Sequence, residues 1–151
     1  MQSVRILWMP SCRMVSSGAG MFGQERFDRF MAWMEQQVRT LHPRDYLYWD
    51  DQAQAMCWLY EYDEAMEVPA EFDMVEFPGG LYAVATDVDQ RTDMEAMRAG
   101  VDAFLTEHGL ERDEGRTQLG HIISAPEAAA VLGYEQMDYY VPVKKPEKIE
   151  K

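Results

Sequence analysis

The chain has 151 residues, of which 47% are hydrophobic and 12% aromatic, and this composition predicts a single folded domain with its own core. Asp and Glu number 27 against 14 Lys and Arg, so the net charge is −13. Such a charge repels nucleic-acid phosphate and anionic membranes, so we expect no direct DNA contact and no membrane partner. No apolar run is long enough to span a membrane and no signal peptide is recognisable, which favours a cytoplasmic protein.

The first half of the chain predicts two strands, a helix and two further strands. VRILWMP at 4–10 ends at a proline, and CRMVSS at 12–17 follows as a second extended piece. Apolar residues then recur every three or four positions, which predicts a helix over about residues 25–40. YLYWDD at 46–51 and AMCWLYEYDE at 55–64 predict two aromatic-rich strands. The buried face of the helix is expected to contain Phe27, Phe30, Met31, Met34 and Val38.

The second half repeats this order. FDMVEFPGGLYAVATDV at 72–88 reads as two strands around a tight turn, and a helix is predicted over about residues 92–107. Its buried face would carry Met94, Met97, Val101, Phe104 and Leu105, and Gly109 would end it. TQLGHIIS at 117–124 and MDYYVPV at 137–143 predict the last strands, separated by one or two helical turns in APEAAAVLG. Residues 145–151 form a charged tail that is expected to fray.

The two halves therefore appear as a duplication, about residues 1–68 and 69–144, in which Pro10 corresponds to Pro78. Proline fixes its own φ at the end of a strand, and the glycines that follow Pro78 allow backbone angles that side chains disfavour. The predicted fold class is α+β, with duplicated β-α-β-β halves in an antiparallel sheet. Both long helices would cover one face, and the other face would carry a ligand groove.

Aromatic residues occupy both side-chain parities of the predicted strands. Met56, Trp58, Tyr60 and Tyr62 alternate with Cys57, Leu59 and Glu61, while Tyr139 and Tyr140 point to opposite faces. Two helices cover a single face, so some of these rings are expected to line an open surface. A surface of this kind suits flat, hydrophobic ligands, and its ring faces would attract a cationic one.

The stretch EFPGGLYAVATDVD, followed by a helix, RTQLGHII and MDYYVPVKK, resembles the GyrI-like effector-binding domains. These occur as ligand-sensing parts of AraC- and MerR-type transcription regulators and as standalone proteins. The resemblance covers about residues 3–144 and includes Pro78, Gly80, residues 82–84 and residues 140–143. It implies a pseudo-twofold domain that binds small hydrophobic or aromatic molecules, including cations, alone or with a DNA-binding regulator or other protein partner.

One position departs from that family. Many members carry a buried glutamate in the penultimate strand, where it pairs with a cationic ligand, and Gly120 stands at that position here. The charge partner would then be Glu76 or Glu61, or the ligand would be neutral. The predicted ligand contacts are Trp58, Tyr60, Glu76, Tyr82, His121 and Tyr140.

Two other functions stay open from the sequence. Some standalone relatives are hydrolases with a buried Glu and Tyr, and Glu76 with Tyr82 could form such a pair, because a carboxylate among aromatics makes a better general base. Other relatives inhibit a protein target, and an acidic chain suits a basic partner surface. His42, His108 and His121 are scattered and the two cysteines form no CxxC pair, so we expect no metal and no cofactor.

Overall fold

The computed structural model describes residues 3–40, 43–88 and 93–146. The predicted start of the second helix at residue 92 and the tail at 147–151 lie outside these residues. The elements in chain order are β1 (Val4–Met9), β2 (Cys12–Gly20), α1 (Glu25–Glu35), β3 (Asp45–Asp50), β4 (Ala55–Glu61), β5 (Asp73–Phe77), β6 (Gly80–Val88), α2 (Met94–Glu107), β7 (Glu111–Arg112), β8 (Leu119–Ile122), α3 (Pro126–Leu132) and β9 (Gln136–Lys144). The predicted α+β class is confirmed.

The strands form one antiparallel sheet in the order β1-β6-β9-β8-β3-β4-β2-β5, with β7 added beside β9. The order is the same from both ends of the sheet. From one end the strands are β1, β6, β9 and β8, and from the other end the corresponding strands of the other half are β5, β2, β4 and β3. The halves meet at its centre, where Leu47 pairs with Gly120. Each half lends its first strand to the other, because β1 pairs with β6 and β5 pairs with β2.

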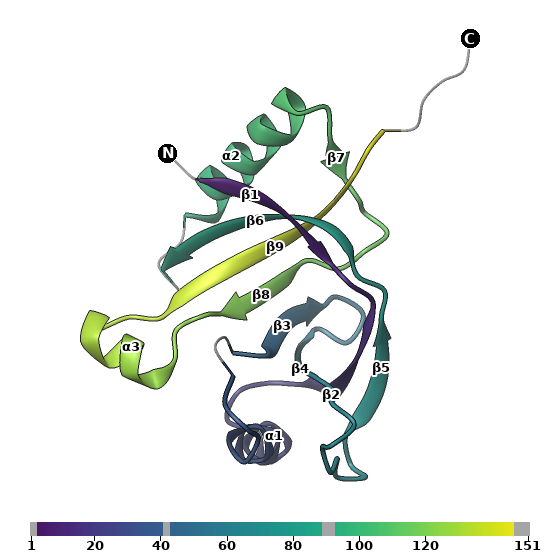
Figure 1. The fold of residues 1–151 in the computed structure, drawn as a ribbon, viewed down its shortest axis with the longest axis vertical. Helices are drawn as coiled ribbons and strands as arrows, with labels where there is room; N and C mark the ends of the chain where they lie inside the picture. The colour runs from purple at the N-terminus through teal and green to yellow at the C-terminus, as the bar shows by residue number, and fades with distance from the viewer. Residues whose placement is uncertain (1–2, 41–42, 89–92, 147–151) are drawn as a thin grey trace.

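Both long helices pack on the same face of this sheet. Ala83 and Val141 are paired neighbours beneath α2, and Leu47 and Trp58 are paired neighbours beneath α1. The register through Gly120 places all four on one side, which we call the helix face, and the opposite side is the free face. Figure 1 shows α2 and α1 at opposite ends of the molecule, with β9, β8 and β3 between them.

The first helix is shorter than its periodicity predicts. It ends at Glu35, and Val38, expected in its buried face, is exposed. The backbone N–H groups of Gln36 and Gln37 bond to carbonyls only three residues back, and the Gln37 side chain donates to the Trp33 carbonyl. These contacts satisfy the last carbonyls and end the helix. The sequence prediction of 25–40 is therefore corrected at its C-terminal end.

The second helix buries Met97, Val101 and Leu105 as expected, whereas Met94 is exposed in its first turn. The expected turns after Ser124 form α3, and Gly109, at φ +67°, follows α2. No helix in the described part of the chain has both the length and the apolar character needed to cross a bilayer.

We expect Asp93→Ala to lower the free energy of unfolding by about 1 kcal/mol. The Asp93 carboxylate accepts a hydrogen bond from the Ala96 backbone N–H at 3.0 Å and so caps α2. Urea denaturation measures the change. Glu95→Ala is the matched control, because it removes an acid from the same turn without removing a cap, and should cost less than about 0.5 kcal/mol. Equal losses would contradict the capping role.

The turn after Pro78 explains why two glycines follow one another. Gly79 and Gly80 have φ of +70° and +120°, a region that residues with a side chain rarely adopt. A methyl group on Gly79 would collide with the carbonyl oxygen of Met9 and lie 2.7 Å from the carbonyl carbon of Pro10. The two points at which the chain crosses between halves, after Met9 and after Phe77, are therefore in direct contact.

Arg116 fixes this crossing from the side. Its guanidinium donates to the carbonyls of Gly79, Leu81 and Val143 at 2.7–2.9 Å, and its Nε donates to Asp113. The guanidinium also lies 4.8 Å from the centre of the Tyr82 ring. One mostly buried side chain thus ties the turn, β9 and the segment before β8 together.

Candidate functional site

A hollow of about 720 Å³ lies on the helix face, where the two halves meet. Its floor is formed by the central strands and includes Leu47 and Gly120, the pair at the middle of the sheet. The β3–β4 turn and the segment from Arg112 to Leu119 form its walls. We call it the helix-face hollow. The residues that give it its apolar character are Leu47, Trp49, Met56, Met137, Tyr139 and Val141.

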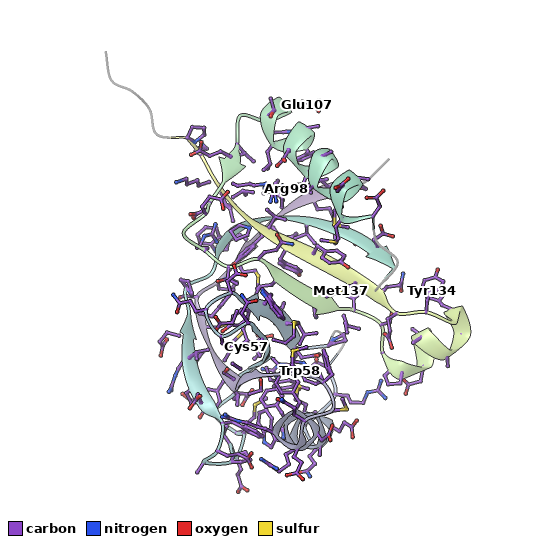
Figure 2. The ribbon with its side chains drawn as sticks, turned by 180° about the vertical axis from the view of Figure 1, so that it is seen from behind. Cys57, Trp58, Arg98, Glu107, Tyr134 and Met137 are labelled. Carbon is purple, nitrogen blue, oxygen red and sulfur yellow. The ribbon has the colours of Figure 1, made fainter. Side chains whose placement is uncertain are left out.

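Aromatic and thioether side chains stand over this floor. Trp49 is 45% exposed although it belongs to a central strand, and Tyr139 is half-buried on the neighbouring half. Figure 2 shows Met137 on the long strand between the two helical ends of the molecule. A Cβ atom on Gly120 would collide with the Met137 methyl group, so the missing side chain leaves room that Met137 occupies. Methionine is flexible, and its terminal methyl can move when a ligand enters.

The rim of the helix-face hollow carries more acids than bases. Four carboxylates, Asp50, Asp51, Asp113 and Glu114, face two guanidinium groups, Arg112 and Arg116. Both arginines are paired: Arg112 with Asp102 at 2.7 Å and Arg116 with Asp113 at 2.9 Å. The Arg116 hydrogen bond and the Gly115 N–H lower the pKa of Asp113.

Three rim carboxylates are left without a cationic partner. Within residues 3–40, 43–88 and 93–146, none of Asp50, Asp51 and Glu114 forms an ion pair. The rim therefore has an uncompensated negative charge, and this favours a ligand with a positive charge.

The free face holds a cluster of aromatic rings that no described helix covers. Tyr82 stacks on Phe77 with ring centres 6.3 Å apart, and Tyr140 contacts Tyr82 at 5.8 Å and Tyr46 at 5.9 Å. All four rings are buried. Figure 1 shows the sheet bending between its α2 end and its α1 end, which lets side chains of one face bury one another. Burial raises the pKa of the Tyr46, Tyr82 and Tyr140 hydroxyls.

A second hollow, of about 610 Å³, opens on the free face beside this cluster. The sequence prediction placed a groove on this face, and a hollow is present there. Three of the six predicted contacts come together on it: Tyr82 lies in the buried cluster, and His121 and Tyr140 line the hollow itself. The His121 and Tyr140 ring centres are 6.1 Å apart.

Trp58 and Tyr60 lie on the opposite face, in the core beneath α1. Trp58 contacts Phe27 and Phe30 and donates its indole N–H to Asp45 at 2.9 Å, while the Tyr60 ring meets Trp33 at 5.5 Å. Figure 2 shows Trp58 next to α1. The structure therefore separates these two rings from Tyr82, His121 and Tyr140.

The expectation that Glu76 is buried is wrong. Its side chain is 83% exposed and pairs with Arg13 at 3.3 Å. The neighbouring Phe77 faces the free-face cluster with Tyr82, so strand alternation directs Glu76 to the other face. The predicted pair of Glu76 and Tyr82 is not brought together.

Sequence reasoning missed the residues of the helix-face hollow. Trp49, Met137 and Tyr139 carry side chains of the right kind, but nothing in their local pattern shows that both helices leave them uncovered. The signal that could have found them is Gly120, which was recognised as a departure from the family pattern. Its parity in the strand places it on the helix face, next to Tyr139 in register. In the described part of the chain, no group of three His, Cys, Asp or Glu side chains is arranged to hold a metal ion.

No family model matches the chain, and neither does any curated protein. Solved structures with the same fold include a hydrolase from Listeria innocua, with a TM-score of 0.65, 13% identity and coverage of 93% of this chain and 91% of that one. The C-terminal domain of EcmrR has a TM-score of 0.67 at 9% identity, covering 97% and 99% of the two chains. SAV2435 bound to tetraphenylphosphonium has a TM-score of 0.56 at 11% identity, with 94% of each chain covered. The chain shares the fold of these proteins.

Proposed function

We propose that the chain is a GyrI-like effector-binding domain whose helix-face hollow binds a small, aromatic, cationic molecule. The observation that carries this proposal is the half-exposed Trp49 above an apolar floor at the junction of two halves. A large indole ring stays exposed on a central strand at a cost in hydrophobic burial, and a flat ligand would recover that burial. The volume of about 720 Å³ is within the range of small-molecule sites.

The charge of the ligand follows from the rim and the rings together. Asp51 and Glu114 add unpaired negative charge at the entrance, and the whole chain carries −13. Trp and Tyr rings present a negative π-face, which attracts cations. Both features favour a delocalised organic cation over an anion of the same shape.

The likeness to known folds supports the same role. SAV2435 was solved with tetraphenylphosphonium, a bulky aromatic cation, and the C-terminal domain of EcmrR belongs to a protein solved in complex with DNA. By analogy, this chain would act as a sensor for a small hydrophobic compound, alone or together with a DNA-binding regulator. Because the chain is acidic and would repel DNA phosphate, the regulator would make the contact with DNA.

We expect Trp49→Ala to weaken tetraphenylphosphonium binding about fivefold, roughly 1 kcal/mol, because the variant removes the ring that contacts the cation. Isothermal titration calorimetry measures the affinity without relying on tryptophan emission. Trp8→Ala is the matched control, since Trp8 is 69% exposed on β1 and does not line the hollow. Its affinity should equal that of the wild type.

Two outcomes would count against the proposed site. If Trp8→Ala and Trp49→Ala weaken binding equally, the cation binds exposed rings without selecting the hollow. If neutral triphenylphosphine oxide binds as tightly as tetraphenylphosphonium, the rim charge has no part in recognition.

A further inference from the structure

The free-face hollow has a polar composition that its aromatic walls do not predict. Side chains from several strands meet there in a row of alternating charge: Arg5 on β1, Asp138 on β9, His121 on β8, and then Arg44 and Glu61 beside β3 and β4. Arg5 donates to Asp138 at 3.2 Å and to Thr86 at 3.3 Å, so one end of the row is satisfied. The other end, at His121 and Arg44, is not.

His121 has one ring nitrogen without a partner. The residue is 5% exposed, and its Nε2 lies 2.6 Å from the carbonyl oxygen of Pro43. A carbonyl only accepts, so Nε2 carries the hydrogen and Nδ1 of the neutral ring is left as an acceptor. Among the residues that the structure describes, Nδ1 is buried and meets no hydrogen-bond partner. Buried polar atoms of this kind are rare unless a ligand, water or ion completes them.

Arg44 is similarly incomplete. Its side chain is 20% exposed, yet its closest ionic contact is Nε to the Glu61 carboxylate at 3.8 Å, beyond hydrogen-bond distance. The guanidinium lies over the Tyr60 ring at 5.8 Å, an interaction that uses its face and leaves its N–H groups available. Within the described ranges, no oxygen accepts a hydrogen bond from it. A guanidinium has five donors in a planar fork that suits a carboxylate.

The sheet register brings these two groups to the same place. Leu47 pairs with Gly120, so the next residues, Tyr46 and His121, lie opposite each other, as their ring contact at 4.5 Å shows. Arg44 lies two residues before Tyr46 in the chain, so its side chain is on the same face. It is diagonal to His121, at a separation that a long side chain can span. Tyr140 closes the other side of the imidazole.

We propose that the free-face hollow is a second ligand site, separate from the helix-face hollow, and that it binds a small planar carboxylic acid. One carboxylate oxygen would accept from the Arg44 guanidinium. Binding would take up one proton from solvent, and His121 Nδ1 would carry it and donate it in a hydrogen bond to the other oxygen, which satisfies the orphaned nitrogen. The flat body of the acid would lie against Tyr46 and Tyr140. The hollow's volume of about 610 Å³ accommodates a ligand of this size.

Benzoate is the probe, and benzamide is its neutral counterpart of the same shape. Calorimetry on the full chain should show benzoate binding in preference to benzamide, and Arg44→Gln should weaken benzoate at least about tenfold. The matched control is Arg13→Gln, because Arg13 also pairs with a glutamate, Glu76, and lies over a tyrosine ring, Tyr62, but outside the hollow. Its benzoate affinity should equal that of the wild type. Thermal unfolding of each variant checks that it is folded.

Two further measurements make the test independent of a loss of affinity. Glu61→Gln removes the carboxylate that competes for Arg44 and should strengthen benzoate binding about threefold or more. Nitrogen NMR of the His121 ring should show Nδ1 shifting on benzoate addition. The proposal is overturned if benzoate does not bind at about 10 mM, or if benzamide binds equally well. It is also overturned if Arg44→Gln leaves benzoate affinity unchanged, or if Glu61→Gln weakens it.

Discussion

Gly79→Ala should lower the free energy of unfolding by about 2 to 5 kcal/mol. Holding alanine in a left-handed conformation costs about 1 to 2 kcal/mol, and forcing extra volume into a packed site costs about 1 to 3 kcal/mol. Both costs apply here, because Gly79 has φ +70° and its added methyl group would collide with the Met9 carbonyl oxygen. The colliding atom belongs to the backbone of the other half, so it cannot move aside as a flexible side chain would.

Gly109→Ala is the control that separates the two causes. Gly109 has nearly the same φ, +67°, but a Cβ atom there meets no other atom within 4 Å. Its loss should be limited to the conformational cost, about 1 kcal/mol. Denaturant unfolding of both variants measures the difference. If the two glycines cost the same, the crossing between halves is looser than the structure describes, and backbone strain alone accounts for the glycine at position 79.

Much of the fold was predictable because the same order of strands and helix recurs in the two parts of the sequence. Helical spacing identified Phe27 and Phe30 in the first half and Met97 and Val101 in the second, and all four are buried. Each prediction rests on a local period that a single chain shows directly. The swap of β1 and β5 between the halves is different, since it depends on pairing between residues 57 to 81 positions apart. No local period encodes such a pairing.

The candidate sites were harder to predict, for a physical reason. Strand parity correctly separates Tyr140 from Tyr139, but it does not say which face the helices take or how far they reach. Phe27 and Phe30 of α1 contact Trp58, and Trp33 contacts Tyr60, so α1 buries these two rings. Trp49 pairs with Met56, beyond the N-terminal part of α1, and stays 45% exposed. Aromatic rings with the same local sequence pattern are therefore part of the core in one place, as Trp58 is, and part of the helix-face hollow in another, as Trp49 is. Glu76 was misjudged because it lies on β5, the edge strand of the sheet, and an edge strand leaves such side chains exposed.

Gly120→Glu combined with Met137→Ala should tighten tetraphenylphosphonium binding about 10- to 100-fold. Gly120 is at the floor of the helix-face hollow, and the Met137 methyl group fills the space that a side chain there would need. Shortening Met137 makes room for the new carboxylate. Coulomb attraction between the carboxylate and the cation contributes roughly 1.5 to 3 kcal/mol at about 6 to 10 Å and an effective dielectric of about 20, which corresponds to this range of affinity.

Gly120→Gln with Met137→Ala keeps the shape of that double variant without its charge, so the ratio of the two affinities isolates the electrostatic part. Triphenylphosphine oxide should bind both double variants equally, because it has no net charge to pair. Burying an unpaired glutamate is costly, so without ligand the Glu variant should also unfold at a lower temperature than the Gln variant and recover when tetraphenylphosphonium is added. Equal cation affinity in the two double variants would place the ligand away from the floor. In that case the rim acids and Trp49 would hold the cation at the entrance of the hollow, and Asp51→Asn would be the more damaging change.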